Sequence, residues 1–272
     1  MIGLDIVITG IPRSGTSYLC GLLNKVKNNI VINEPDRLSI LLSASADPIV
    51  AADYYKMVRE RVLSGKQIEN KMIDGSIIED TALRQNFEMY YPDYENEAFS
   101  LCTKNTLGYL SRLDKFPKVM PNAPIFACIR NPIDTIASWK TTFEHLKLAS
   151  VAENFVIGSK KDVYLTDWQK EKVNEISKEK LVSRRRALFW TYLAEWIELN
   201  REILTIIDYN NIVLFPEETS RLILNGANRD IEFKVPVKPS SIRTGKRESL
   251  DSEDYKAIEE ICQPIAEKMK IL

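Results

Sequence analysis

Apolar and polar positions along the chain predict strands and helices that follow one another in turn. Short, nearly unbroken apolar runs such as 4–9 and 124–129 are typical of strands buried on both faces. The expected strands are 4–9, 30–33, 71–74, 99–103, 124–129 and 204–208. The expected helices are 15–27, 51–64, 80–91, 132–147, 181–202, 216–225 and 251–268. This alternation predicts an α/β fold, a three-layer sandwich with a mostly parallel central sheet.

The pattern gives no sign of a domain boundary. The 272 residues contain no internal repeat, low-complexity tract or clear linker, and α/β folds of this length often form one unit. We therefore expect a single domain over residues 1–272. The polar stretch around 148–180 is the best candidate for an insertion, as a lid or as part of a substrate site.

Composition and charge narrow the classes of function. The net charge of −1 argues against nucleic acid as a partner. No stretch approaches the ~18 consecutive apolar residues of a membrane span, and no secretion signal precedes the first strand. We therefore expect a cytoplasmic protein, and the oligomeric state stays open. The cysteines lack metal-site or disulfide spacing and are expected to be reduced core residues; they are Cys20, Cys102, Cys128 and Cys262.

Residues 10–17, Gly-Ile-Pro-Arg-Ser-Gly-Thr-Ser, directly follow the first expected strand and have the spacing of a phosphate-binding loop. The two glycines let the backbone fold tightly around an anion, and Arg13 adds a cation. Thr16 and Ser17 begin the next helix, whose positive dipole end favours an anion. Thr16 stands where such loops usually carry the lysine that reaches a nucleoside triphosphate. The loop predicts a phosphate site in a P-loop nucleotide-kinase-like fold, without the clamp for ATP or GTP hydrolysis.

A second segment joins a strand, a cation and a helix start. The apolar run 124–129 ends in Arg130, and Pro132 suits the first turn of a helix. That helix would place Asp134 and Ser138 one turn apart on the same face. The geometry predicts a second anion site at the carboxyl end of a strand. An ion pair between Arg130 and Asp134 explains the same residues equally well.

These two segments resemble the PAPS-dependent sulfotransferases, whose donor is 3′-phosphoadenosine 5′-phosphosulfate (PAPS). In that family a P-[RK]-S-G-T-[ST] loop holds the 5′-phosphosulfate, and R-x-[PA]-x-D-x-x-x-S grips the 3′-phosphate. Residues 12–17 and 130–138 match these motifs in the same order. Residues 207–212 and 241–245 more loosely resemble a later strand end and an R-x-G loop. The resemblance implies a donor site made of Arg13, Ser14, Gly15, Thr16, Ser17, Arg130, Ser138, Tyr209, Arg243, Thr244 and Gly245.

The resemblance also implies the catalytic residues. Family members that act on phenols and steroids often use the histidine of a K-x-H motif, but residues 104–106 read K-N-T. Residues 33–35 read N-E-P and resemble a strand end of the carbohydrate and bacterial branches, where a glutamate serves as the base. Glu34 is therefore the implied base. Arg13 and Lys104 are the implied cations that stabilise the leaving phosphate.

Two properties of Glu34 are expected from its surroundings. Pro35 restricts Glu34 to extended backbone. Burial beside apolar surface raises the pKa of a carboxyl group toward the range useful for a base. A surface carboxylate without a catalytic role explains Glu34 nearly as well. His145 is interpreted as a solvated or capping residue, and it is the base if Glu34 is not.

The sequence thus predicts an enzyme that moves a sulfuryl group from PAPS to a hydroxyl of a carbohydrate or other small acceptor. No metal is expected, because the chain has one histidine and no H-E-x-x-H motif, and because a sulfuryl group carries less charge than a γ-phosphoryl group. Two alternatives stay open. One is a P-loop kinase of a small metabolite, and the other is a protein that binds the nucleotide without turnover.

Overall fold

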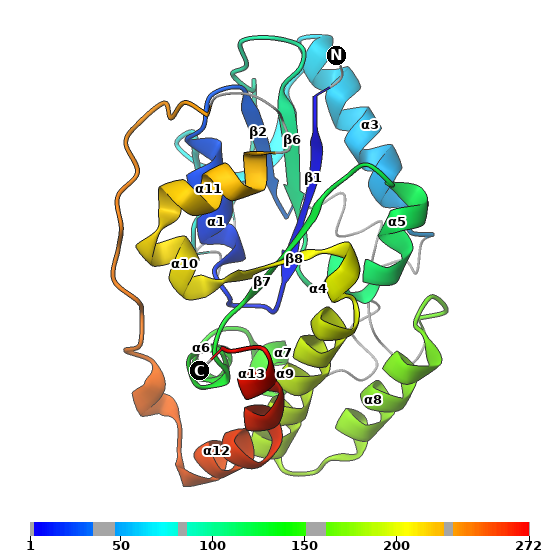
Figure 1. Cartoon of the computed structure of the whole chain (residues 1–272), viewed down its shortest axis with the longest axis vertical. Coiled ribbons are helices and arrows are strands. Elements are labelled where there is room, and N and C mark those ends of the chain that lie inside the picture. The colour runs from blue at the N-terminus through cyan, green and yellow to red at the C-terminus, as the bar shows by residue number, and fades with distance from the viewer. Residues whose placement is uncertain (1–2, 35–46, 81–85, 151–161, 226–230, 272) are drawn as a thin grey trace.

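The computed structural model describes residues 3–34, 47–80, 86–150, 162–225 and 231–271. At its centre a five-stranded parallel sheet lies between two layers of helices (Figure 1). In spatial order the strands are β2 (Asn29–Asn33), β6 (Ser100–Lys104), β1 (Asp5–Gly10), β7 (Ile125–Ile129) and β8 (Thr205–Asp208). Because β1 is central, the loop that follows it opens at the middle of the sheet edge. The predicted α/β sandwich with a mostly parallel sheet is confirmed.

Helices cover both faces of the sheet. The helices are α1 (Thr16–Asn24), α3 (Ile49–Leu63), α4 (Leu107–Ser111), α5 (Phe116–Val119), α6 (Pro132–Lys140), α7 (Glu144–Lys147), α8 (Asp167–Lys178), α9 (Val182–Leu199), α10 (Tyr209–Leu214), α11 (Pro216–Leu224), α12 (Ser252–Ala257) and α13 (Gln263–Lys268). A π-helix, Ile258–Cys262, joins α12 to α13, and short 3-10 turns lie at Leu113–Lys115, Arg201–Ile203 and Arg247–Ser249.

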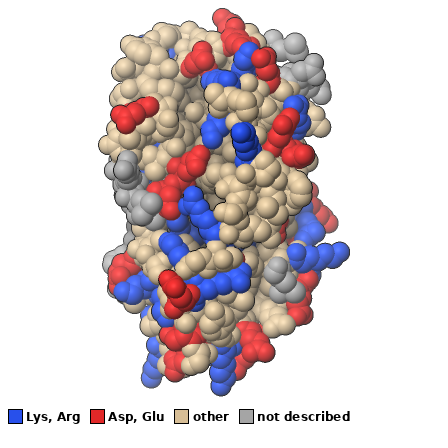
Figure 2. Space-filling view, turned by 90° about the vertical axis from the view of Figure 1, so that its left-hand side faces the viewer, with Lys and Arg blue, Asp and Glu red and all other residues tan. Residues whose placement is uncertain are grey.

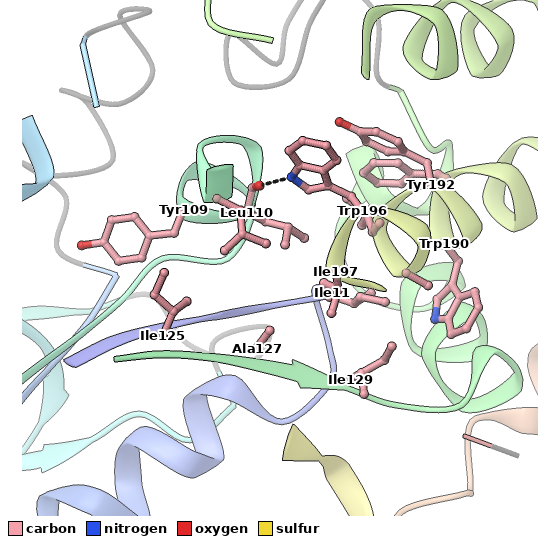
Figure 3. Packing of buried hydrophobic residues seen from close by; sticks show 14 of the residues in the cluster. Ile11, Tyr109, Leu110, Ile125, Ala127, Ile129, Trp190, Tyr192, Trp196 and Ile197 are labelled. Atoms are coloured by element: carbon pink, nitrogen blue, oxygen red, sulfur yellow. Dashed lines mark hydrogen bonds between the residues drawn. The ribbon is translucent and has the colours of Figure 1, made fainter. Parts of the chain in front are cut away.

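Alternate residues of each strand enter two separate apolar cores. Ile6 and Ile8 of β1 pack with α1, α10 and α11 on one face. Val7 joins the larger core on the other face, which includes α3, α4 and α9. Figure 3 shows part of this larger core, where Trp196 of α9 donates a hydrogen bond from Nε1 to the Leu110 carbonyl at 2.8 Å.

A second, antiparallel sheet flanks the edge strand β2. It has the order β4 (Ser76–Ile77), β3 (Ile68–Ile73), β5 (Phe87–Tyr90). The Asn70 side chain donates to the Val31 carbonyl at 2.7 Å and accepts from the Asn33 N–H at 2.8 Å. The strand expected at 71–74 therefore belongs to this smaller sheet and begins earlier than expected.

Two helix predictions were wrong in part. A helix was expected at 80–91, but residues 87–90 form β5, because pairing with β3 outweighs local helix propensity; residues 81–85 lie outside the described part. The helix expected at 132–147 is two helices. The hydroxyls of Thr141 and Thr142 donate to carbonyls of the last turn of α6, and this turn ends the helix.

Other expectations concern the polar stretch around 148–180 and the cysteines. Residues 151–161 lie outside the described part, whereas Trp168 of α8 stacks on Trp196 of α9 with ring centroids 5.5 Å apart. A lid in this stretch and a single domain over the chain stay predictions. All four cysteines are buried and free of disulfides, as expected. None of the helices in the described part is long and apolar enough to span a membrane.

Candidate active site

The carboxyl ends of the central strands bring the candidate residues into one row. Glu34 follows β2, Lys104 ends β6, the 10–17 loop follows β1, and Arg130 follows β7. Lys104 lies in register with Asn33 of β2 on one side and with Ile8 of β1 on the other. The order of the parallel strands thus sets the order of the candidate base, the lysine, the phosphate loop and Arg130 along the sheet edge.

Both glycines of the phosphate loop are closely packed against neighbouring groups. The Cys128 backbone lies against Gly10, and the Tyr209 ring lies against Gly15. Gly10 has φ +144°, and a Cβ there would lie 2.2 Å from the Cys128 carbonyl oxygen. Gly15 caps α1 with φ +88°, and a Cβ there would lie 2.6 Å from the ring of Tyr209. Only glycine fits both positions, so the loop needs both of its glycines for packing as well as for backbone freedom.

Neighbouring side chains hold the loop further. Ser14 Oγ donates to the Ile11 and Cys128 carbonyls, at 2.6 and 2.9 Å, and its N–H donates to Ile11 at 3.1 Å. The N–H and the hydroxyl of Ser14 thus both donate within the protein, and its place in the donor site stays a prediction. Thr16 and Ser17 are buried in the first turn of α1. Trp139 of α6 donates from Nε1 to the Pro12 carbonyl at 2.8 Å.

Arg13 joins the two sequence motifs. Its φ is +72°, an uncommon backbone conformation for a residue with a side chain. Nε donates to Ser138 Oγ at 3.1 Å, across 125 residues of sequence. Nη2 forms an ion pair with Asp80 Oδ1 at 2.9 Å. Ser138 therefore lies beside the phosphate loop, while Asp80 is a partner that no sequence motif indicated.

Arg130 is buried against Tyr209. The guanidinium carbon lies 4.1 Å from the centroid of the Tyr209 ring, and Nη2 donates to the backbone carbonyl of Arg243. Its contact with Asp134 is long, at 3.9 Å, because Asp134 binds Arg247 at 2.6 and 3.0 Å. The Nε of Arg130 is buried and has no hydrogen-bond partner within the described part of the chain. The unused donor and the 3.9 Å separation from Asp134 leave this guanidinium able to bind an anion.

The chain after α11 brings further cations to this place. Residues 231–246 pass along α10, where Ser240 donates its N–H to the Val213 carbonyl at 2.9 Å (Figure 1). Partial loss of water and the charges of Arg13, Arg130 and Arg243 lower the pKa of Lys246. Figure 2 shows Lys and Arg side chains gathered around a hollow at mid-height of this face. Thr244 and Gly245 are exposed, and among the described residues nothing lies within 4 Å of a Cβ at Gly245.

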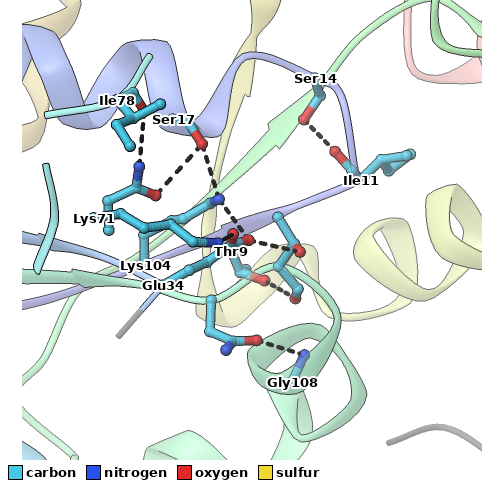
Figure 4. A network of polar contacts seen from close by, with 12 residues as sticks. Thr9, Ile11, Ser14, Ser17, Glu34, Lys71, Ile78, Lys104 and Gly108 are labelled. Carbon is cyan, nitrogen blue, oxygen red and sulfur yellow. Dashed lines mark hydrogen bonds and ion pairs between the residues drawn. The ribbon is translucent and has the colours of Figure 1, made fainter. Parts of the chain in front are cut away.

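Glu34 lies between two ammonium groups (Figure 4). Lys104 Nζ is 2.6 Å from Oε1, and Lys71 Nζ of β3 is 3.0 Å from Oε2. Lys104 is 2 % exposed and also donates to Ser17 Oγ at 3.1 Å. Lys104 therefore connects the candidate base to the phosphate loop. The sequence gave no sign of Lys71, because β3 reaches Glu34 from outside the central sheet.

Both expected properties of Glu34 were wrong. Its φ of +47° is left-handed and not extended, so the contacts of its side chain outweigh the preference imposed by the following proline. Burial raises the pKa of Glu34, but the charges and hydrogen bonds of Lys104 and Lys71 outweigh burial and lower it to about 2. The carboxylate is ionised at neutral pH and is a weak base while both lysines bind it. The role of Glu34 as the base stays a prediction.

His145 lies within electrostatic range of Glu34. Burial lowers the pKa of His145, while the negative charge of Glu34 acts in the opposite direction. The ring stacks on Phe143 with centroids 5.5 Å apart. His145, the alternative base, is therefore close enough to Glu34 to be affected by its charge. The sequence did not indicate this proximity.

The lowered pKa of Glu34 predicts a pH-dependent stability. The pKa falls from about 4.5 in the unfolded chain to about 2 in the folded protein, so the ionised carboxylate stabilises the fold by about 3 kcal/mol above pH 4.5. This contribution is lost as the pH falls toward 2. Urea unfolding of wild type and Glu34→Gln should therefore differ most near pH 7 and converge on acidification. A difference that stays constant down to pH 3 would contradict the ion-pair account.

Comparison with known proteins gives one family. The model of a family described as "Sulfotransferase family" matches residues 5–232. Among solved structures, the chain is similar to the sulfotransferase STF1 from Mycobacterium tuberculosis H37Rv, with 12% identity, a TM-score of 0.43, and 95% of this chain and 71% of that chain covered. It is also similar to the sulfotransferase STF9 from Mycobacterium avium, with 13% identity, a TM-score of 0.42, and 99% and 76% covered. A search of curated proteins gave no match.

Proposed function

Because the chain belongs to the sulfotransferase family, we propose that it transfers a sulfuryl group from PAPS to a hydroxyl of a carbohydrate or another small acceptor. One observation carries the assignment of the donor. Arg13 and Arg243 both pair with Asp80, Arg130 donates to the Arg243 carbonyl, and the buried Nε of Arg130 lacks a partner within the described residues. A donor with anionic groups at both its 5′ and its 3′ positions gives each part of this cluster a partner.

The residues present fit such a donor. The start of α1 and the loop N–H groups favour the 5′ anionic group, and Arg13 adds charge there. The 3′-phosphate would be held by Arg130, Ser138 and the 243–245 loop. The Tyr209 ring would keep the Arg130 guanidinium in place by packing against it. The bound donor would supply an activated sulfuryl group, and this chemistry requires no metal.

Glu34 and Lys104 would divide the catalytic work. Glu34 would accept the proton of the acceptor hydroxyl as its oxygen attacks sulfur. Lys104, with Arg13, would stabilise the negative charge that develops on the leaving phosphate. Because Lys104 binds both Glu34 and Ser17, an anion at the loop competes with Glu34 for this ammonium. A weakened Lys104 contact raises the pKa of Glu34 and makes it a better base.

Arg130→Ala tests the donor assignment without an acceptor. A charge-assisted hydrogen bond contributes about 1.5–3 kcal/mol, so the affinity for adenosine 3′,5′-bisphosphate should fall by about one to two powers of ten. The affinity for 5′-AMP, which lacks the 3′-phosphate, should barely change. Isothermal titration calorimetry measures both affinities.

Arg13→Ala is the matched control, because we assign the Arg13 charge to the 5′-phosphate that both ligands share. It should weaken the binding of 5′-AMP and of the bisphosphate alike. Equal losses for both ligands in Arg130→Ala would refute the 3′-phosphate assignment. Wild-type protein that binds ATP with Mg²⁺ in preference to the bisphosphate would be a metabolite kinase instead.

A further inference from the structure

Asp80 lies at the junction of the two halves of the proposed donor site. Its Oδ1 is 2.9 Å from Arg13 Nη2, in the phosphate loop, and its Oδ2 is 3.8 Å from Arg243 Nη1, in the late loop. Its negative charge raises the pKa of Lys246, opposing the arginines that lower it. One carboxylate thus pairs with Arg13 and Arg243, two of the basic residues that would bind the donor.

Asp80 reaches this cluster from outside the central sheet. It follows the β3–β4 hairpin, whose neighbouring acid, Glu79, points elsewhere: Glu79 pairs with Lys25 at 3.6 Å and packs against Gly21 of α1. The side chains of Asp80 and Arg13 are 23 % and 16 % exposed. Their ion pair is therefore partly shielded from water, and it is stronger than a pair on the open surface.

One edge of the Arg13 guanidinium is occupied: Nε donates to Ser138 Oγ and Nη2 donates to Asp80 Oδ1. A phosphate that binds this edge through both donors, in the bidentate geometry typical of arginine, replaces the carboxylate. A phosphate and a carboxylate that share the same cations also repel each other. The Asp80 carboxylate and the phosphate of the ligand therefore compete for the same edge of the Arg13 guanidinium.

We propose that Asp80 is a resident counter-anion that determines the affinity of the donor site for phosphates. This inference rests on the proposed function. In the ligand-free protein the single charge of Asp80 offsets part of the repulsion between Arg13 and Arg243. When a nucleotide binds, its phosphate displaces the carboxylate. When the bisphosphate product leaves, Asp80 rebinds Arg13, so the same carboxylate favours product release and excludes weakly binding anions such as inorganic phosphate.

The proposal predicts opposite effects on binding and on stability. Asp80→Asn keeps the size of the side chain and removes its charge. Because a charge-assisted contact no longer has to be broken, the variant should bind adenosine 3′,5′-bisphosphate about ten- to a hundredfold more tightly in calorimetric titration. Its ligand-free melting temperature should fall, since the basic groups lose their counter-anion. Glu79→Gln removes a charge one residue away and should leave the affinity for the bisphosphate unchanged.

A merely structural role gives a different result. If Asp80 only positions Arg13 for the ligand, Asp80→Asn and Asp80→Ser will bind the bisphosphate as wild type does or more weakly, and the proposal is wrong. Inorganic phosphate serves as a second probe that does not depend on the nature of the donor. If wild type fails to bind the bisphosphate while phosphate still raises the melting temperature of Asp80→Asn more than that of wild type, the donor assignment fails and the counter-anion stands.

Discussion

Glu34→Gln should lower turnover by a factor of about 10²–10⁴, the usual contribution of a general base. The amide keeps the shape of the side chain but cannot accept the proton of the acceptor hydroxyl. Turnover is measured by transfer of radiolabelled sulfate from PAPS to an acceptor identified with the wild-type enzyme. The variant should still bind adenosine 3′,5′-bisphosphate, because the proposed phosphate contacts come from the 10–17 loop and from Arg130 and not from Glu34.

His145→Ala provides the contrast for this experiment. The charge of Glu34 acts on the pKa of His145, and His145 is the alternative candidate for the base. We expect His145→Ala to retain most of its turnover. Near-normal turnover in Glu34→Gln together with loss of activity in His145→Ala would transfer the role to the histidine and would remove the basis for a carbohydrate acceptor.

Lys104→Met should lower turnover by about 10²–10³, the loss typical of removing one group that stabilises developing charge. Lys104 is the ammonium that contacts both Glu34 and the first turn of α1, so it is placed to respond to the leaving phosphate. The rate of sulfuryl transfer at saturating donor measures this effect, and circular dichroism checks that the variant is folded.

Lys71→Met is the matched control for Lys104→Met. Lys71 binds the same carboxylate at 3.0 Å but comes from β3, and no contact with the phosphate loop is found for it in the described part of the chain. Its loss should raise the pKa of Glu34 and change turnover far less than the loss of Lys104. Equal losses in the two variants would mean that the lysines act only by holding Glu34.

The central sheet could be predicted from the sequence because each of its strands is a short apolar run in a local pattern. The phosphate loop and Arg130 could be predicted for a related reason, since each motif directly follows such a strand. The second sheet could not, because β5 depends on pairing with β3 and carries no strong pattern of its own. Residues 87–90 therefore looked helical in sequence.

The electrostatics of the site depend on residues that are distant in sequence. The pKa of Glu34 is set by Lys71 and Lys104, which lie 37 and 70 residues away from it. Asp80 meets Arg13 across 67 residues. Burial alone predicts a raised pKa for Glu34. No sequence pattern indicates that Lys71 and Lys104 pair with Glu34, or that Asp80 pairs with Arg13 of the phosphate loop. Motifs locate the groups, whereas their ionisation depends on the tertiary fold.

The Asn70 amide has a consequence for how the protein behaves at high concentration. Strand β2 reads Asn-Ile-Val-Ile-Asn and forms one margin of the central sheet, where unpaired backbone groups could template a strand from a second molecule. By bonding to Val31 and Asn33, one side chain imitates the backbone of a further strand and closes this margin. The Asn70 amide thereby occupies two backbone groups of β2 that a strand from a second molecule would need for pairing.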